Sequence, residues 1–240
     1  MTAALTGFAA PAAASAIVVT SKTWLWYATR ATGLVALVLL TATTALGVLS
    51  SVRWQRPGWP RFVTAGLHRN VSVLACALVL VHIATTLADG FVPIQLQDAV
   101  LPYGSVYRPL WLGLGAASFD LMVALIVTSL LRTRMSYRAW RAVHWAAYLC
   151  WAAAIVHGLG TGTDTQLGWV RWIYLGSVAF VIWLAGLRLA HGWPEHAAVR
   201  VAAGLVLAVA LVAWLIWLQK GPMVAGWAHR AGSTTTSGPR

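Results

Sequence analysis

Residues 138–157, RAWRAVHWAAYLCWAAAIVH, decide the fold of this chain. The stretch begins with basic and aromatic residues and continues as an apolar run that is long enough to cross a bilayer as a helix. Two histidines, His144 and His157, lie near the two ends of the apolar run. Burying a charged side chain in hydrocarbon costs roughly 2.5 to 3.5 kcal/mol on insertion scales, so a titratable residue placed there indicates a function.

The composition places the whole chain in a membrane. Of 240 residues, 60% are apolar and only 9% are charged, whereas about a quarter of a soluble domain is charged. The net charge of +12 does not indicate nucleic-acid binding, because the basic residues form short clusters between apolar runs, as in a polytopic membrane protein surrounded by lipid. Cys76 and Cys150 lie in apolar runs without a Cys-x-x-Cys motif, which argues against zinc, iron–sulfur and covalently attached haem sites.

Six apolar runs approach the ~20 residues that a transmembrane helix needs. They predict an all-α integral membrane protein, a six-transmembrane-helix bundle. The transmembrane domain is expected to cover residues 23–219, between a weakly apolar tail (residues 1–22) and a C-terminal tail of disordered composition (residues 220–240). The expected spans are 24–50, 66–88, 109–131, 139–160, 168–190 and 197–218.

Arginines predict the orientation of the bundle in the cell membrane. The loops after the first, third and fifth spans are basic, whereas the alternate loops carry aspartates. The positive-inside rule therefore places the three basic loops in the cytoplasm and both termini outside it. Lysines and arginines near the two termini favour the opposite orientation.

The second span repeats the histidine pattern of the fourth. His68 and His82 are 14 residues apart, and His144 and His157 are 13 apart. Both spans start from a cytoplasmic loop and run parallel, so equal distances along them mean equal depths. At 1.5 Å per residue, the second histidine lies ~21 Å beyond the first in one span and ~20 Å in the other. Depth therefore pairs His68 with His144, and His82 with His157.

Each pair suits an iron porphyrin clamped between the second and fourth spans, because imidazoles on both axial faces favour electron transfer over oxygen chemistry. A helix turns about 100° per residue, so 14 residues return to within about 40° of the starting face, whereas 13 residues end about 140° away. The fourth span therefore requires a kink or a π-bulge. A competing interpretation is that each histidine only hydrogen-bonds a backbone carbonyl of a neighbouring helix.

With these histidines, the segments 108–113 (RPLWLG) and Thr128-Ser129 in the third span resemble the ferric-reductase-like transmembrane domain over residues 24–190. This superfamily includes ferric reductases, NADPH oxidases and the haem subunit of the bacterial methionine sulfoxide reductase system. The resemblance implies two b-type haems and electron transfer from the cytoplasm outward. The implied ligands are His68 and His144 for the inner haem, and His82 and His157 for the outer haem.

The chain also departs from that superfamily. Ferric reductases and NADPH oxidases carry a cytoplasmic flavin and nicotinamide domain, for which this chain has neither room nor a Gly-x-Gly-x-x-Gly motif after a strand. The methionine sulfoxide reductase subunit lacks that domain too, but it has no counterpart of His68. We therefore expect a stand-alone membrane cytochrome b, the electron-transfer subunit of an oxidoreductase, without a catalytic side chain or a flavin or NAD(P)H site.

Such a module needs partners. The expected donor is a separate cytoplasmic flavoprotein, and the expected acceptor is an extracytoplasmic protein or ferric iron. A quinol-linked membrane cytochrome b is one alternative. A haem-free transporter or scaffold with structural histidines is another.

Three arginines are candidate partners of the haem propionates. Arg69 and Arg141 flank the inner histidine pair and serve equally well as orientation charges. Arg30, in the first span toward the outer side, also suits snorkelling to the lipid headgroups. Asp120, at the centre of the third span, is either protonated and hydrogen-bonded inside the bundle or part of a proton relay.

Overall fold

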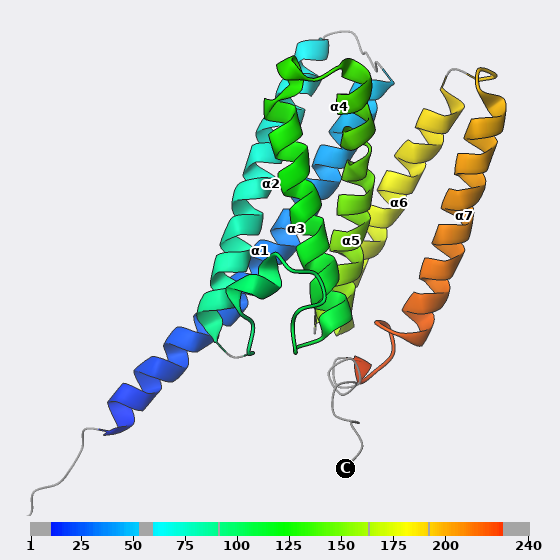
Figure 1. Cartoon of the computed structure of the whole chain (residues 1–240). Helices are drawn as coiled ribbons and strands as arrows, with labels where there is room; N and C mark the ends of the chain where they lie inside the picture. The colour runs from blue at the N-terminus through cyan, green and yellow to red at the C-terminus, as the bar shows by residue number, and fades with distance from the viewer. Residues whose placement is uncertain (1–10, 53–59, 91, 163, 192, 228–240) are drawn as a thin grey trace, which may run out of the picture.

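The computed structural model describes residues 11–52, 60–90, 92–162, 164–191 and 193–227, and this part of the chain folds into helices joined by short connections (Figure 1). Six helical segments are long and apolar enough to cross a membrane, so the chain is a multi-pass membrane protein. The helices are α1 (Pro11–Ser51), α2 (Arg61–Asp89), η1 (Leu96–Ala99), α3 (Pro109–Leu130), η2 (Arg132–Arg134), α4 (Tyr137–His144), α5 (Ala146–Thr161), η3 (Asp164–Gln166), α6 (Gly168–Ala190) and α7 (Ala197–Lys220).

The six apolar segments coincide with the predicted spans, and helical or turn structure extends beyond them at both ends. Helix α1 begins at Pro11, although its apolar segment begins only at Trp24. After α7, residues 221–227 turn back toward the bundle, and Gln166 donates a hydrogen bond to the carbonyl of Pro222. The rest of the expected tails, residues 1–10 and 228–240, lies outside the described residues.

The fourth span is divided into two helices. Helix α4 starts after Ser136, whose hydroxyl accepts a hydrogen bond from the amide of Ala139 at 3.2 Å, and it ends at His144. A turn at Trp145 separates it from α5, which starts at Ala146. The histidine spacing required an irregularity in this span, and the structure has one directly after the first histidine.

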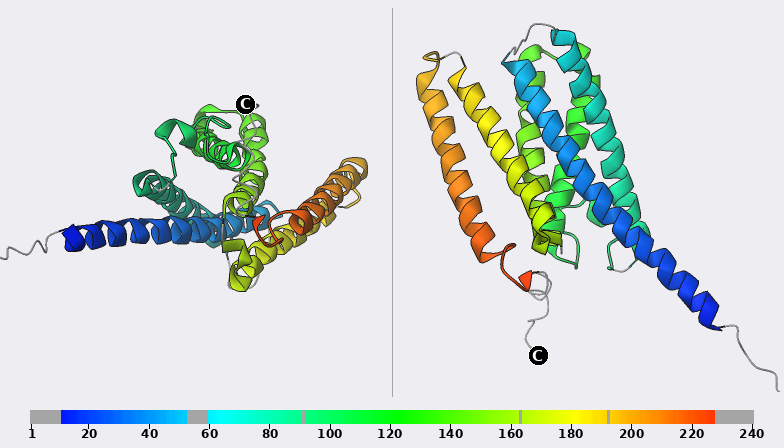
Figure 2. Two further views of the ribbon diagram at one scale, coloured as in Figure 1. Left: turned by 90° about the horizontal axis from the view of Figure 1, so that it is seen from below. Right: turned by 180° about the vertical axis from the view of Figure 1, so that it is seen from behind.

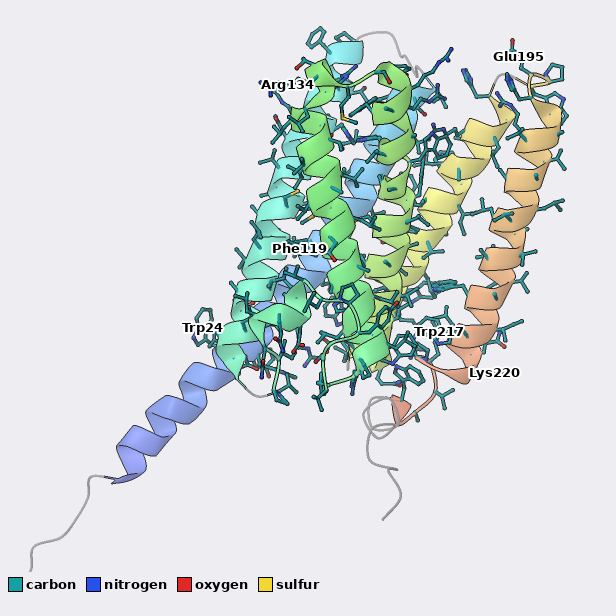
Figure 3. All side chains as sticks on the ribbon, viewed as in Figure 1. Trp24, Phe119, Arg134, Glu195, Trp217 and Lys220 are labelled. Atoms are coloured by element: carbon teal, nitrogen blue, oxygen red, sulfur yellow. The ribbon has the colours of Figure 1, made fainter. Side chains whose placement is uncertain are left out.

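The bundle is built from two antiparallel helix pairs. Helix α1 packs along α2, and α3 packs along α5, while α1 also contacts α5 and α6. Helix α7 lies at the edge of the bundle, where its neighbour is α6 (Figure 2). The C-terminal ends of α1, α3 and α6 lie at one end of the bundle, together with Arg134 and Glu195, whereas Lys220 lies at the opposite end (Figure 3).

Polar contacts join the helices at the centre of the bundle. Trp151 of α5 donates its indole N–H to the hydroxyl of Thr41 in α1 at 3.0 Å, and both side chains are buried. Ser118 of α3 donates to the carbonyl of Cys150 in α5 at 2.9 Å. In lipid, helices associate through close packing and such hydrogen bonds, because lipid tails are as apolar as the side chains. These contacts therefore fix how α1 and α3 sit against α5.

We expect Thr41→Val to lower the thermal unfolding temperature of the purified protein, because it leaves the buried indole N–H of Trp151 without an acceptor. Hydrogen bonds between membrane helices contribute about 0.6 kcal/mol on average and up to about 1.7 kcal/mol. Thr44→Val is the matched control, since the hydroxyl of Thr44 bonds only the Leu40 carbonyl of its own helix. Equal losses in the two variants would show that the bond between helices contributes nothing.

Candidate functional site

The four intramembrane histidines meet in two pairs. The ring centroids of His68 and His144 are 6.3 Å apart, with an angle of 66° between the ring planes. The centroids of His82 and His157 are 6.4 Å apart, at 81°. Each pair joins one residue of α2 to one residue of the divided fourth span. The structure thus brings together the histidines that their depth had paired.

Three of the four rings are oriented by the same hydrogen bond. In each, Nδ1–H donates to a backbone carbonyl of the helix packed alongside. A carbonyl only accepts, so Nδ1 carries the proton and the lone pair of the ring lies on Nε2. The competing interpretation, in which each histidine only hydrogen-bonds a backbone carbonyl, therefore accounts for the Nδ1 atoms of these three rings. Their Nε2 atoms remain available for a metal. The bonds run from His68 to Thr43 at 3.0 Å, from His82 to Thr29 at 2.8 Å, and from His157 to Trp111 at 2.9 Å.

A glycine makes room for each of these three rings. Each glycine comes four positions after the residue whose carbonyl accepts the histidine bond, so it lies one helical turn further along on the same helix face. A Cβ at Gly33 would lie 2.9 Å from the His82 ring, and a Cβ at Gly115 would lie 2.6 Å from the His157 ring. At Gly47 the distance to the His68 ring would be 3.4 Å. The sequence analysis missed these glycines, although Gly33 and Gly47 repeat the 14-residue spacing of the α2 histidines.

Each of these three histidines also has a hydroxyl-bearing residue four positions later. The hydroxyl donates to the backbone carbonyl of the histidine and adds a second polar contact at the same turn of the helix. The pairs are Ser72 with His68 at 2.6 Å, Thr86 with His82 at 2.7 Å, and Thr161 with His157 at 2.8 Å. His144 is followed at that position by Tyr148 and differs from the other three.

The two pairs fit bis-imidazole haem ligation. Two imidazoles on opposite faces of one metal have centroids about 6.2 Å apart, given metal–nitrogen bonds of about 2.0 Å and a ring radius of about 1.1 Å. The observed separations are 6.3 and 6.4 Å. Within the described residues, no three His, Cys, Asp or Glu side chains gather to hold a bare ion. A pair of histidines is sufficient for a porphyrin, which supplies the remaining iron ligands itself.

The predicted arginines occupy different environments. Arg69 and Arg141 have exposed side chains near the inner pair, and their role toward propionates stays a prediction. Arg30 forms an ion pair with Asp164 of η3, and its guanidinium lies 3.9 Å from the centroid of the Trp26 ring. This ion pair neutralises the charge of Arg30, which the sequence analysis did not predict. Asp120 is half-buried in α3, and its role remains open.

Two further arginines lie at the end of the bundle that carries His144. The guanidinium of Arg132 lies 4.6 Å from the centroid of the Trp140 ring, and that ring stacks on His144 with centroids 4.8 Å apart and planes at 24°. Arg188 of α6 hydrogen-bonds the hydroxyl of Tyr148. The sequence spacing indicates the contact of Trp140 with His144, because residues four positions apart share a helix face.

The outer pair is supported by Arg108, which lies directly before α3 in a left-handed backbone conformation. Its buried guanidinium donates to the carbonyl of Thr161 at 2.9 Å, at the end of α5. Carbonyls in the last turn of a helix have no partner within the helix, so this bond ties the start of α3 to the end of α5. Trp111 and His157 lie one turn inward on these two helices.

The family model described as "Ferric reductase like transmembrane component" matches residues 32–156, which is more than half of the chain. The matched segment contains His68, His82 and His144 and stops one residue before His157. No curated protein gives a significant match. No solved structure does so either.

We expect Gly115→Ala to lower the haem content of the purified protein, because the added methyl group overlaps the His157 ring and forces it off the Trp111 carbonyl. The haem-to-protein ratio and the reduced-minus-oxidised absorption spectrum measure this loss. Gly176→Ala is the matched control, since an added Cβ there meets no atom within 4 Å. Full haem content in Gly115→Ala would show that the glycine is not needed for the site.

Proposed function

Because the chain belongs to the ferric reductase like transmembrane component family, we propose that it is a di-haem b-type cytochrome that carries electrons across the cell membrane. The observation that carries this proposal is the separation of the two histidine pairs, 6.3 and 6.4 Å between ring centroids, which suits one iron between each pair of imidazoles. His68 and His144 hold the inner haem, and His82 and His157 hold the outer haem.

When bound, each haem supplies a centre that accepts and releases one electron. The residues of this chain determine what else the iron can do. An iron held by both imidazoles of a pair would have no free coordination position, so these residues would favour electron transfer over binding of oxygen. The carbonyl bonds to Nδ1 fix the tautomer and orientation of three rings and raise their basicity as ligands, which stabilises the oxidised iron.

The space between the two levels is filled by packed side chains. Ile155 of α5, between the two levels, is almost fully buried, and Trp151 is buried in the same apolar cluster. Close packing excludes water from the bundle and keeps the surroundings of the haems rigid. A rigid and dry environment is what repeated one-electron transfer between two fixed centres requires.

The direction of transfer follows from the orientation that we propose. The C-terminal ends of α1, α3 and α6 lie at one end of the bundle, and the arginines that follow these helices in the sequence favour the cytoplasm. The inner pair then faces a separate cytoplasmic flavoprotein donor, and the basic surface steers an acidic face of that donor toward the inner haem. Electrons leave from the outer pair to an extracytoplasmic protein or to ferric iron.

The purified protein is expected to show a low-spin b-type spectrum with two haems per chain. His82→Ala and His157→Ala should each remove the same outer haem, and His68→Ala should remove the inner haem instead, because each iron needs both imidazoles of its pair. A colourless protein that keeps its fold after substitution of all four histidines would favour a haem-free transporter or scaffold.

The donor is tested by a comparison of two reductants. We expect a cytoplasmic flavin reductase to reduce the haems of the purified protein faster than a quinol analogue, because the inner pair lies at the basic end of the bundle. Stopped-flow absorption measures both rates. Faster reduction by the quinol analogue would identify a quinol-linked cytochrome.

A further inference from the structure

Helix α7 and the turn after it contact the first turn of α3 through three tryptophans. The ring centroids of Trp111 in α3 and Trp217 in α7 are 5.4 Å apart, and those of Trp111 and Trp227 are 5.6 Å apart. The centroids of Trp217 and Trp227 are 6.3 Å apart, so all three distances lie in the range of aromatic contacts. Figure 3 shows Trp217 and Lys220 at the end of the bundle opposite Arg134. The three rings therefore form one aromatic cluster at the end where α3 begins.

The turn after α7 lies outside the segment that the family model matches, and it is fixed to the bundle. Pro222 is almost fully buried, and Met223 packs against the apolar core cluster. The side-chain amide of Gln166 in η3 donates to the carbonyl of Pro222 at 3.4 Å and to the carbonyl of Val224 at 3.3 Å. Trp227 is thus carried by a segment that is itself held in place.

Trp111 also packs directly on α5, the helix that carries His157. A Cβ at Gly160 would lie 2.4 Å from the Trp111 ring, so the ring rests on the α5 backbone at this glycine. Gly160 comes three residues after His157 and lies within one helical turn of it. The backbone carbonyl of Trp111 accepts the hydrogen bond from His157 Nδ1 at 2.9 Å. Trp111 therefore contacts the other two indoles through its side chain and orients His157 through its backbone.

The position of this carbonyl depends on contacts from outside α3. Helix α3 begins at Pro109, so Trp111 lies in its first turn. The amides of a first turn have no acceptor within their own helix, so fewer helical hydrogen bonds hold this turn than hold the middle of the helix. The contacts of the Trp111 ring therefore contribute to keeping its carbonyl against His157.

From these contacts we infer that Trp217 and Trp227 are positioning residues for His157, and that through Trp111 they lower the midpoint potential of the outer haem. The inference rests on the proposed haem function and deepens it. A firm bond from Nδ1 to the carbonyl makes Nε2 a more basic ligand, which stabilises the oxidised iron. Without the two rings the carbonyl is held less firmly, the bond weakens, and the oxidised iron loses stabilisation.

Redox titration of variants that retain one haem tests the inference. His68→Ala retains only the outer haem, and His82→Ala retains only the inner haem. In the His68→Ala background we expect Trp227→Leu and Trp217→Leu each to raise the midpoint potential, because leucine remains apolar but removes the ring contacts. In the His82→Ala background the same two substitutions should leave the potential unchanged.

Two further variants separate positioning from general packing. Trp227→Phe keeps an aromatic ring at the contact and should keep the parent potential. Trp172→Leu is the matched control, since the side chain of Trp172 in α6 is 74% exposed. Loss of the outer haem alone in the leucine variants, with Trp227→Phe retaining it, would also support the positioning role.

Three results would overturn the inference and leave the proposed function standing. They are an unchanged outer-haem potential in both leucine variants, an equal rise in Trp172→Leu, and an equal rise at the inner haem. A protein without haem would overturn both the inference and the proposed function.

Discussion

A buried imidazole has two nitrogens, and the fold depends on satisfying both of them inside hydrocarbon. An unsatisfied polar group in the bilayer costs several kcal/mol, so each ring needs a partner for its N–H and a use for its lone pair. In His68, His82 and His157 the N–H goes to a carbonyl of the adjacent helix. The lone pair is left on Nε2, where it is available to the iron that we propose between the two rings of each pair.

This requirement sets the contact between neighbouring helices. A ring can reach a backbone carbonyl only if that helix approaches closely, and a Cβ at the contact would prevent the approach at Gly33 and Gly115. Small residues are what allow membrane helices to pack closely. The α1–α2 pair and the α3–α5 pair therefore solve the same problem in the same way, and the rest of the bundle, α6 and α7, packs outside them.

The sequence was sufficient for the features that depend on length and depth. The length of the apolar runs predicted the six spans, and the matched spacing of the histidines predicted which of them meet. Features that depend on the rotation of one helix against another were missed. The ion pair of Arg30 with Asp164 joins residues 134 positions apart, and the glycines beside the rings are recognisable only once the facing helix is known. Likewise, nothing in the composition of residues 221–227 shows that they pack back against the bundle.

The break at Trp145 links the two levels of the site. A continuous helix would turn His144 about 140° away from the face of His157, so a 13-residue spacing brings both rings onto one face only if the helix is irregular between them. The irregularity at Trp145 lies directly after His144, whose ring lies beside His68. The other three rings bond a carbonyl of the adjacent helix through Nδ1, whereas the His144 ring stacks on Trp140. The two histidine pairs therefore differ in how their rings are held.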